Sequence, residues 1–224
     1  MNYRYVFLDA DNTLLDFDRS EDCALGDALA YGGLADTPAL RAQYRRINRS
    51  WWERLERAEV TRGEVLVGRW REYLAFCGAS GVPEEINAYY LERLGSYSFT
   101  LPGAAELCAE LRRRGHVLAL LTNGNVDVQR RRWGISPAAP FVEHVFVSGN
   151  VGYEKPDRRF FDHVLTALGA ERAQCLMVGD SETSDMRGGV NAGIDTCWYN
   201  PAGAPAHGAW TYEIRTLDAL LDIV

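Results

Sequence analysis

Five short apolar runs recur along the chain, and their pattern limits the fold more than any other feature of the sequence. They occupy residues 3–8, 116–121, 145–147, 175–178 and 194–199. None of them alternates cleanly between apolar and polar residues, which is typical of strands buried on both faces of a parallel sheet. We therefore expect each run to form a strand of a covered sheet.

Helical patterns lie between these runs. In residues 102–114, Leu107 and Leu111 share one face and Gly115 follows as a stop signal. In residues 157–168 the apolar positions likewise form one stripe before a glycine. Strands that alternate with helices in this way predict an α/β fold with a Rossmann-like parallel sheet.

Residues 17–97 break this alternation and show helical periodicity throughout. Apolar residues recur at helical spacing in two stretches, Leu40, Tyr44, Ile47, Trp51 and Leu55, and then Leu66, Trp70, Tyr73, Leu74 and Cys77. We therefore predict an α/β core made of residues 1–16 and 98–224, with an all-helical cap domain, residues 17–97, inserted after the first strand.

Charge and composition exclude several classes of protein. The 24 basic and 31 acidic residues give a net charge of −7, a poor match for a nucleic-acid backbone. No apolar run is long enough to span a membrane. The five cysteines show neither paired nor zinc-like spacing, as expected of reduced thiols. These features predict a cytoplasmic protein that binds neither nucleic acid nor a membrane.

A pair of carboxylates follows the first predicted strand, at the edge where open α/β sheets bind their ligands. Asp9 and Asp11 would repel each other in one small volume, and a hard cation such as Mg²⁺ would relieve that repulsion. One carboxylate of such a pair can attack phosphorus, and the other can transfer a proton. The simpler alternative is a turn whose aspartates cap a helix.

Polar residues also follow the other predicted strands. Thr122 and Asn123 suit either a phosphate oxygen or a helix N-cap. Lys155 could neutralise a phosphate or lie exposed on the surface. Asp180 stands where a third acidic metal ligand is needed, and Asp185 could support Asp180 or Lys155 from a second layer. Together these residues supply what phosphoryl transfer requires, which no single motif does.

At these positions the chain resembles the haloacid-dehalogenase-like (HAD) superfamily over nearly its whole length. Asp9 and Asp11 match its first motif, Thr122 the second and Lys155 the third. Asp180, with Asp185, matches the fourth motif. The inserted helical segment resembles the cap of that family, which governs the choice of substrate.

The resemblance implies a role for each matched residue. Asp9 would be the nucleophile and a Mg²⁺ ligand, and Asp180 would be another protein ligand. Asp11 would be the general acid and base, with its backbone carbonyl also on the metal. The phosphate would be held by Thr122, Asn123 and Lys155.

A narrower resemblance is to the bacterial pyrimidine 5′-nucleotidases, which remove phosphate from nucleoside monophosphates. It is carried by residues 9–17, 121–124, 179–185, 188–189, 191–193 and 198–200. An aspartate at Asp11 is typical of the phosphatases and phosphomutases of the superfamily. The resemblance implies a small-molecule phosphate monoester as substrate, such as UMP or dTMP.

Two other functions stay open from the sequence. One is a HAD phosphatase of different specificity, acting on phosphoglycolate or a sugar phosphate, and the other is a non-catalytic HAD-fold binding protein. The sequence also leaves open which cap residues contact the nucleoside, whether Mn²⁺ replaces Mg²⁺, and whether the chain is a monomer or a homodimer.

Overall fold

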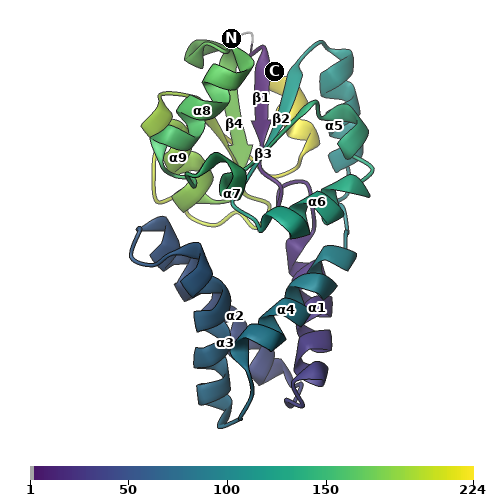
Figure 1. Ribbon diagram of the computed structural model, residues 1–224. Helices are drawn as coiled ribbons and strands as arrows, with labels where there is room; N and C mark the ends of the chain where they lie inside the picture. The colour runs from purple at the N-terminus through teal and green to yellow at the C-terminus, as the bar shows by residue number, and fades with distance from the viewer. Residues whose placement is uncertain (1–2) are drawn as a thin grey trace. The chain divides into compact units, whose positions relative to one another are not determined.

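A six-stranded parallel sheet lies in one of the two units of the structure, a computed structural model that describes residues 3–224 (Figure 1). The strands are β1 (Tyr5–Leu8), β2 (Val117–Thr122), β3 (His144–Val147), β4 (Cys175–Gly179), β5 (Asp195–Tyr199) and β6 (Tyr212–Ile214). Their order in the sheet is β3-β2-β1-β4-β5-β6, and every neighbouring pair is parallel. The predicted α/β fold with a Rossmann-like parallel sheet is confirmed.

The chain divides into two compact units. One runs up to Phe17 and resumes from Ser98 to Val224, and the other is Asp18–Tyr97. Besides the sheet, the first unit contains α5 (Ala104–Arg113), α6 (Val126–Gly134), α7 (Ser148–Val151), α8 (Arg158–Leu168) and α9 (Arg187–Ala192). The second is built from α1 (Phe17–Tyr31), α2 (Pro38–Glu56), α3 (Arg62–Cys77) and α4 (Pro83–Ser96). None of the helices among residues 3–224 has the length and apolar content needed to cross a bilayer.

The central strands β1, β2 and β4 are buried on both faces, which explains why they lack an alternating pattern. In β1, Val6 and Leu8 belong to the apolar cluster that includes Leu107 and Leu111 of α5. The alternate residues of β1, Tyr5 and Phe7, belong to a second cluster on the other face, with Phe160, Phe161 and Val164 of α8. Figure 1 shows α5 and α8 on opposite sides of the sheet.

The sixth strand was not predicted from the sequence. Tyr212–Ile214 is three residues long, too short for a periodic signal, and it pairs with β5 alone at the edge of the sheet.

The helical unit has an aromatic core. Tyr44 of α2, Trp70 and Tyr73 of α3, and Tyr90 of α4 are fully buried. The Tyr44 ring centroid lies 4.7 Å from that of Trp70 and 5.5 Å from that of Tyr73. The helical stripes of the sequence therefore mark packing positions, and Trp70 belongs to this core.

The strand register brings distant loops to one edge of the sheet. Leu8 of β1 pairs with Leu120 of β2 on one side and with Val178 of β4 on the other. The Asp9 amide extends this ladder by donating to the Val178 carbonyl, with an N–O distance of 2.9 Å. The residues that follow these three strands consequently emerge side by side.

Close packing of α9 on the sheet depends on a glycine and can be tested there. A Cβ atom on Gly189 would lie 2.5 Å from Cγ2 of Thr196 in β5. We expect Gly189→Ala to lower the free energy of unfolding by about 1–3 kcal/mol, as measured by chemical denaturation. Gly134→Ala in α6, where a Cβ would meet no atom within 4 Å, is the control and should change it by less than about 1 kcal/mol. Equal stability of both variants would contradict this packing.

Candidate active site

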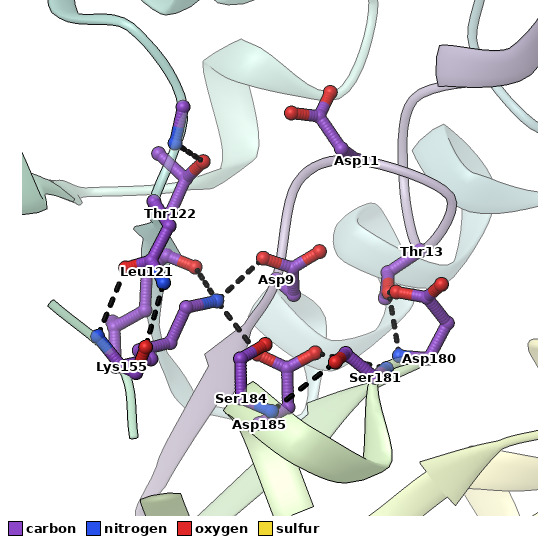
Figure 2. Close-up of polar contacts among 12 residues, drawn as sticks. Asp9, Asp11, Thr13, Leu121, Thr122, Lys155, Asp180, Ser181, Ser184 and Asp185 are labelled. Atoms are coloured by element: carbon purple, nitrogen blue, oxygen red, sulfur yellow. Dashed lines mark hydrogen bonds and ion pairs between the residues drawn. The ribbon is translucent and has the colours of Figure 1, made fainter. Parts of the chain in front are cut away.

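Three carboxylates from different parts of the chain meet at the strand ends (Figure 2). Asp9 follows β1, Asp180 follows β4, and Asp185 lies in the short helical turn Glu182–Met186. Each offers an oxygen, and these three oxygens lie within 4.8 Å of one another. Loops that are more than 160 residues apart in sequence therefore form one acidic cluster.

Lys155 is buried against this cluster. Its ammonium group donates to Asp9 Oδ1 and Asp185 Oδ1, each at 2.6 Å, and to the carbonyl of Leu121 at 2.8 Å. These three bonds occupy the three donors of an ammonium group. Burial alone would lower the pKa of Lys155, but Asp185 and Asp9 outweigh it and raise that pKa above its ordinary value. Lys155 is therefore a permanently charged member of the site.

Asn123 fixes the backbone at Lys155. Its side-chain Nδ2 donates to the Lys155 carbonyl at 2.8 Å, and its Oδ1 accepts from the Lys155 amide at 2.9 Å. The predicted role for Asn123 was a direct contact with phosphate. The structure shows its side chain bonded to the backbone of Lys155, and the phosphate contact of Asn123 stays a prediction.

The acidic cluster carries more negative charge than Lys155 can neutralise. Burial raises the pKa of Asp9 well above its ordinary value, Lys155 opposes this, and Asp185, Asp180 and Asp11 raise it further. Burial, followed by repulsion from Asp185, raises the pKa of Asp180 to about 7. Carboxylate oxygens are the ligands that Mg²⁺ prefers, and a divalent cation would relieve this repulsion. The donor set thus fits Mg²⁺.

Two residues with no predicted role, Thr13 and Trp198, hold Asp180. The Thr13 hydroxyl accepts from the Asp180 amide at 3.1 Å and donates to Asp180 Oδ1 at 3.3 Å. The indole N–H of Trp198 donates to the Asp180 carbonyl at 2.8 Å. Thr13 is fully buried directly after the acidic pair, and that position in the motif was the available signal.

Asp185 was predicted to support Asp180 or Lys155, and it bonds to Lys155. Its second oxygen, Oδ2, accepts from the amide of Ser181 at 3.2 Å. A Cβ atom on Gly179 would lie 2.2 Å from this oxygen, so the missing side chain at Gly179 lets Asp185 approach the end of β4. Asp185 therefore lies in the acidic cluster as well as beside the lysine.

The side chain of Asp11 does not join this cluster. Figure 2 shows its carboxylate pointing away from that of Asp9. Gln129 Nε2 donates to Asp11 Oδ2 at 2.6 Å, and Arg132 Nη1 donates to Asp11 Oδ1 at 2.5 Å. The ligand predicted from Asp11 is its backbone carbonyl, and that contact stays a prediction. Gln129 and Arg132 were not predicted as site residues.

Thr122 lies at the end of β2 with a buried hydroxyl. Its Oγ1 accepts from the Gly124 amide at 3.0 Å and from Gln129 Nε2 at 3.0 Å. A hydroxyl has two acceptor lone pairs and one proton to donate. Because both lone pairs are used, the Thr122 hydroxyl is set to donate its proton to a further acceptor such as a phosphate oxygen.

Comparisons with known proteins identify similar sequences and a similar structure. The family model of haloacid dehalogenase-like hydrolases matches residues 3–193. The pyrimidine 5′-nucleotidase PynA of Streptococcus pneumoniae is 35% identical over 99% of this chain and 95% of its own, and the pyrimidine 5′-nucleotidase YjjG of Escherichia coli is 28% identical over 89% and 87%. The crystal structure of the HAD-hydrolase YfnB from Bacillus subtilis, bound to magnesium, has a TM-score of 0.94 and 33% identity, covering 100% of this chain and 99% of that one.

The raised pKa of Asp180 predicts a pH dependence of stability in metal-free protein. In the folded state this carboxyl keeps its proton up to about pH 7, whereas its ordinary pKa is 3.8. The folded state therefore binds more protons in that interval, and raising the pH through it favours unfolding. We expect the free energy of unfolding to fall by about 1–2 kcal/mol over this interval. This is less than the full shift in pKa would give, because Asp180 is partly exposed to solvent. Urea unfolding in EDTA at several pH values measures it.

Magnesium should reverse this effect, because it binds the deprotonated carboxylates. We expect added Mg²⁺ to raise the midpoint of thermal unfolding most strongly at neutral pH and to flatten the pH dependence. Asp180→Asn should remove most of both responses, whereas Asp127→Asn, an exposed residue of α6, should keep them. A midpoint that Mg²⁺ leaves unchanged in the wild-type protein would contradict the metal site.

Proposed function

The chain belongs to the haloacid dehalogenase-like hydrolase family, and we propose that it is a Mg²⁺-dependent phosphatase of pyrimidine nucleoside 5′-monophosphates. The observation that carries this proposal is the contact between Asp9 and the buried ammonium of Lys155, inside an acidic cluster at the strand ends. The substrate class is supported by the relatives PynA and YjjG, both pyrimidine 5′-nucleotidases.

Asp9 is the proposed nucleophile. Its Oδ1 is held by Lys155, and among residues 3–224 no donor engages its Oδ2. Attack by Oδ2 on phosphorus forms an aspartyl phosphate as the bond between phosphorus and the ester oxygen breaks. A second attack, by water, releases inorganic phosphate and restores the carboxylate.

Lys155 and Thr122 are the proposed phosphate-stabilising residues, and they act differently. The three donors of Lys155 are bonded within the protein, so it contributes a fixed positive charge beside the reacting carboxylate. Thr122 contributes a directed O–H donor. Such preorganised groups stabilise charge that develops on the phosphoryl oxygens.

Asp11 is the proposed acid and base. It would give a proton to the departing 5′-oxygen and then take one from the water that attacks the aspartyl phosphate. Because the nucleophile and the leaving oxygen lie on opposite sides of phosphorus in an in-line displacement, the acid must stand apart from Asp9. The outward direction of the Asp11 carboxylate meets this requirement (Figure 2).

Mg²⁺ would be held by Asp9, Asp180 and the Asp11 carbonyl, with Asp185 alongside. When bound, it supplies positive charge that offsets the acidic cluster and the incoming phosphate. Thr13 and Trp198 hold the loop that carries Asp180 in place for this contact.

Replacing the nucleophile tests the catalytic proposal. We expect Asp9→Asn to lower kcat on UMP and on p-nitrophenyl phosphate by about 1,000-fold or more, because an amide oxygen cannot form the aspartyl phosphate. Asp127→Asn should keep wild-type activity. Phosphate release in the presence of Mg²⁺ is the measurement. A wild-type protein as inert as Asp9→Asn would instead favour a non-catalytic binding protein.

A substrate panel tests the specificity. We expect kcat/KM for UMP and dTMP to exceed that for phosphoglycolate and sugar phosphates by about 10-fold or more, equivalent to at least 1.4 kcal/mol of transition-state discrimination. Purine monophosphates in the same panel separate pyrimidine preference from general nucleotidase activity. Faster turnover of phosphoglycolate or of a sugar phosphate would overturn the proposed substrate class.

A further inference from the structure

Helix α6 places two buried polar side chains against Asp11. Gln129 and Arg132 are one helical turn apart and share a face, and each is at most 1% exposed. They donate to different oxygens of the Asp11 carboxylate, at 2.6 and 2.5 Å. Arg130 and Arg131 of the same helix are exposed. Gln129 and Arg132 thus hold both oxygens of the Asp11 carboxylate.

A fully buried guanidinium group is costly unless it is paired with a charge and hydrogen-bonded, as Arg132 is with Asp11. The Arg132 guanidinium carbon lies 5.5 Å from the centre of the Phe17 ring, and its carbonyl accepts from the Ser98 hydroxyl at 2.8 Å. These contacts fix Arg132 on its side chain and on its backbone. A residue anchored in this way can in turn fix the orientation of Asp11.

Gln129 links the acid to the proposed phosphate site. Its Nε2 donates to Asp11 Oδ2 and, at 3.0 Å, to Thr122 Oγ1. Its Oε1 is buried, and among residues 3–224 no donor reaches it, an arrangement that costs stability. A Cβ atom on Gly124 would lie 2.3 Å from Nε2, so Gly124 leaves room for this amide. The amide orientation thus favours the two contacts to Thr122 and Asp11 over satisfaction of its own oxygen.

We infer that Gln129 and Arg132 are positioning residues that align the Asp11 carboxylate for proton transfer to the leaving oxygen. This inference rests on the proposed phosphatase function. Proton transfer needs the acid within hydrogen-bond reach of the leaving oxygen, and two fixed donors restrict the rotation of the Asp11 side chain. Loss of either donor should therefore matter most when the leaving group needs a proton.

The basicity of the leaving group separates this role from a merely structural one. The alkoxide of a nucleoside needs a proton to depart, whereas p-nitrophenolate leaves readily without one. With enzyme in excess over substrate, a single turnover reports leaving-group release before the aspartyl phosphate is hydrolysed. We expect Arg132→Gln to slow uridine release from UMP by about 10- to 100-fold and p-nitrophenol release by less than about 3-fold. Gln129→Leu also loses the contact to Thr122, so it should slow both releases, uridine release by about 10-fold more than p-nitrophenol release.

Matched variants control for indirect effects. Arg131→Gln, at an exposed position one residue away, should leave both rates at the wild-type level. Arg132→Lys keeps a cationic donor and should recover part of the UMP rate. In an Asp11→Asn background, Arg132→Gln should add less than about 3-fold to the loss with UMP, because the two residues act as one unit. Circular dichroism melts show which variants fold. If Arg132→Gln does not fold, Gln129→Leu tests the inference in its place.

The outcomes distinguish this inference from the proposal on which it rests. Equal losses with both substrates in folded variants would show a structural role, and unchanged rates would show none. Either result overturns the inference while leaving the phosphatase function intact. A wild-type protein that releases neither uridine nor p-nitrophenol would overturn the proposed function, and the inference with it.

Discussion

The ion pairs of Lys155 with Asp9 and Asp185 are the interactions on which the geometry of the candidate active site depends. A buried ammonium group is tolerated when charged partners and further hydrogen bonds replace its water. Two carboxylates and the Leu121 carbonyl do so here, and Asn123 fixes the adjacent backbone. Removing this cation would leave the like charges of the buried Asp9 and Asp185 facing one another. The lysine therefore orders the two aspartates through contacts within the protein alone.

The parallel sheet makes this arrangement available. Strands that are distant in sequence end at the same edge, and the register of β1 with β2 and β4 sets which residues emerge there. Apolar clusters on both faces hold the strands in place. Two glycines allow close contacts because they lack a side chain. Gly179 leaves room for the Asp185 carboxylate, and Gly189 leaves room for the side chain of Thr196. Burial of apolar surface thus offsets the cost of gathering acidic groups at one end.

Much of the fold could be predicted because it depends on local pattern. The central strands appear as unbroken apolar runs, and the acidic residues directly follow them. The contacts of Gln129 and Arg132 could not be predicted, because periodicity indicates which face of a helix is buried and not which group it meets. Both lie beside Val128 and Trp133 on the buried face of α6, where polar residues are a weak signal of a partner. Tyr212–Ile214 was missed because three residues carry no period.

The two aspartates of the first loop differ in surroundings more than in sequence position. Asn12 between Asp11 and Thr13 adopts a left-handed backbone with φ of 61°, and the amides of Leu14 and Leu15 turn back to the Ala10 carbonyl. This turn separates the environments of the two carboxylates. Asp9 faces a lysine and other acids, which suits an attacking group that shares a cation.

Asp11 faces an amide and a guanidinium on a neighbouring helix, which hold its carboxylate in a defined orientation. Environments that differ in this way allow identical side chains to take opposite roles in one reaction. The proposed division of labour between nucleophile and acid would thus depend on α6 as much as on the acidic motif itself.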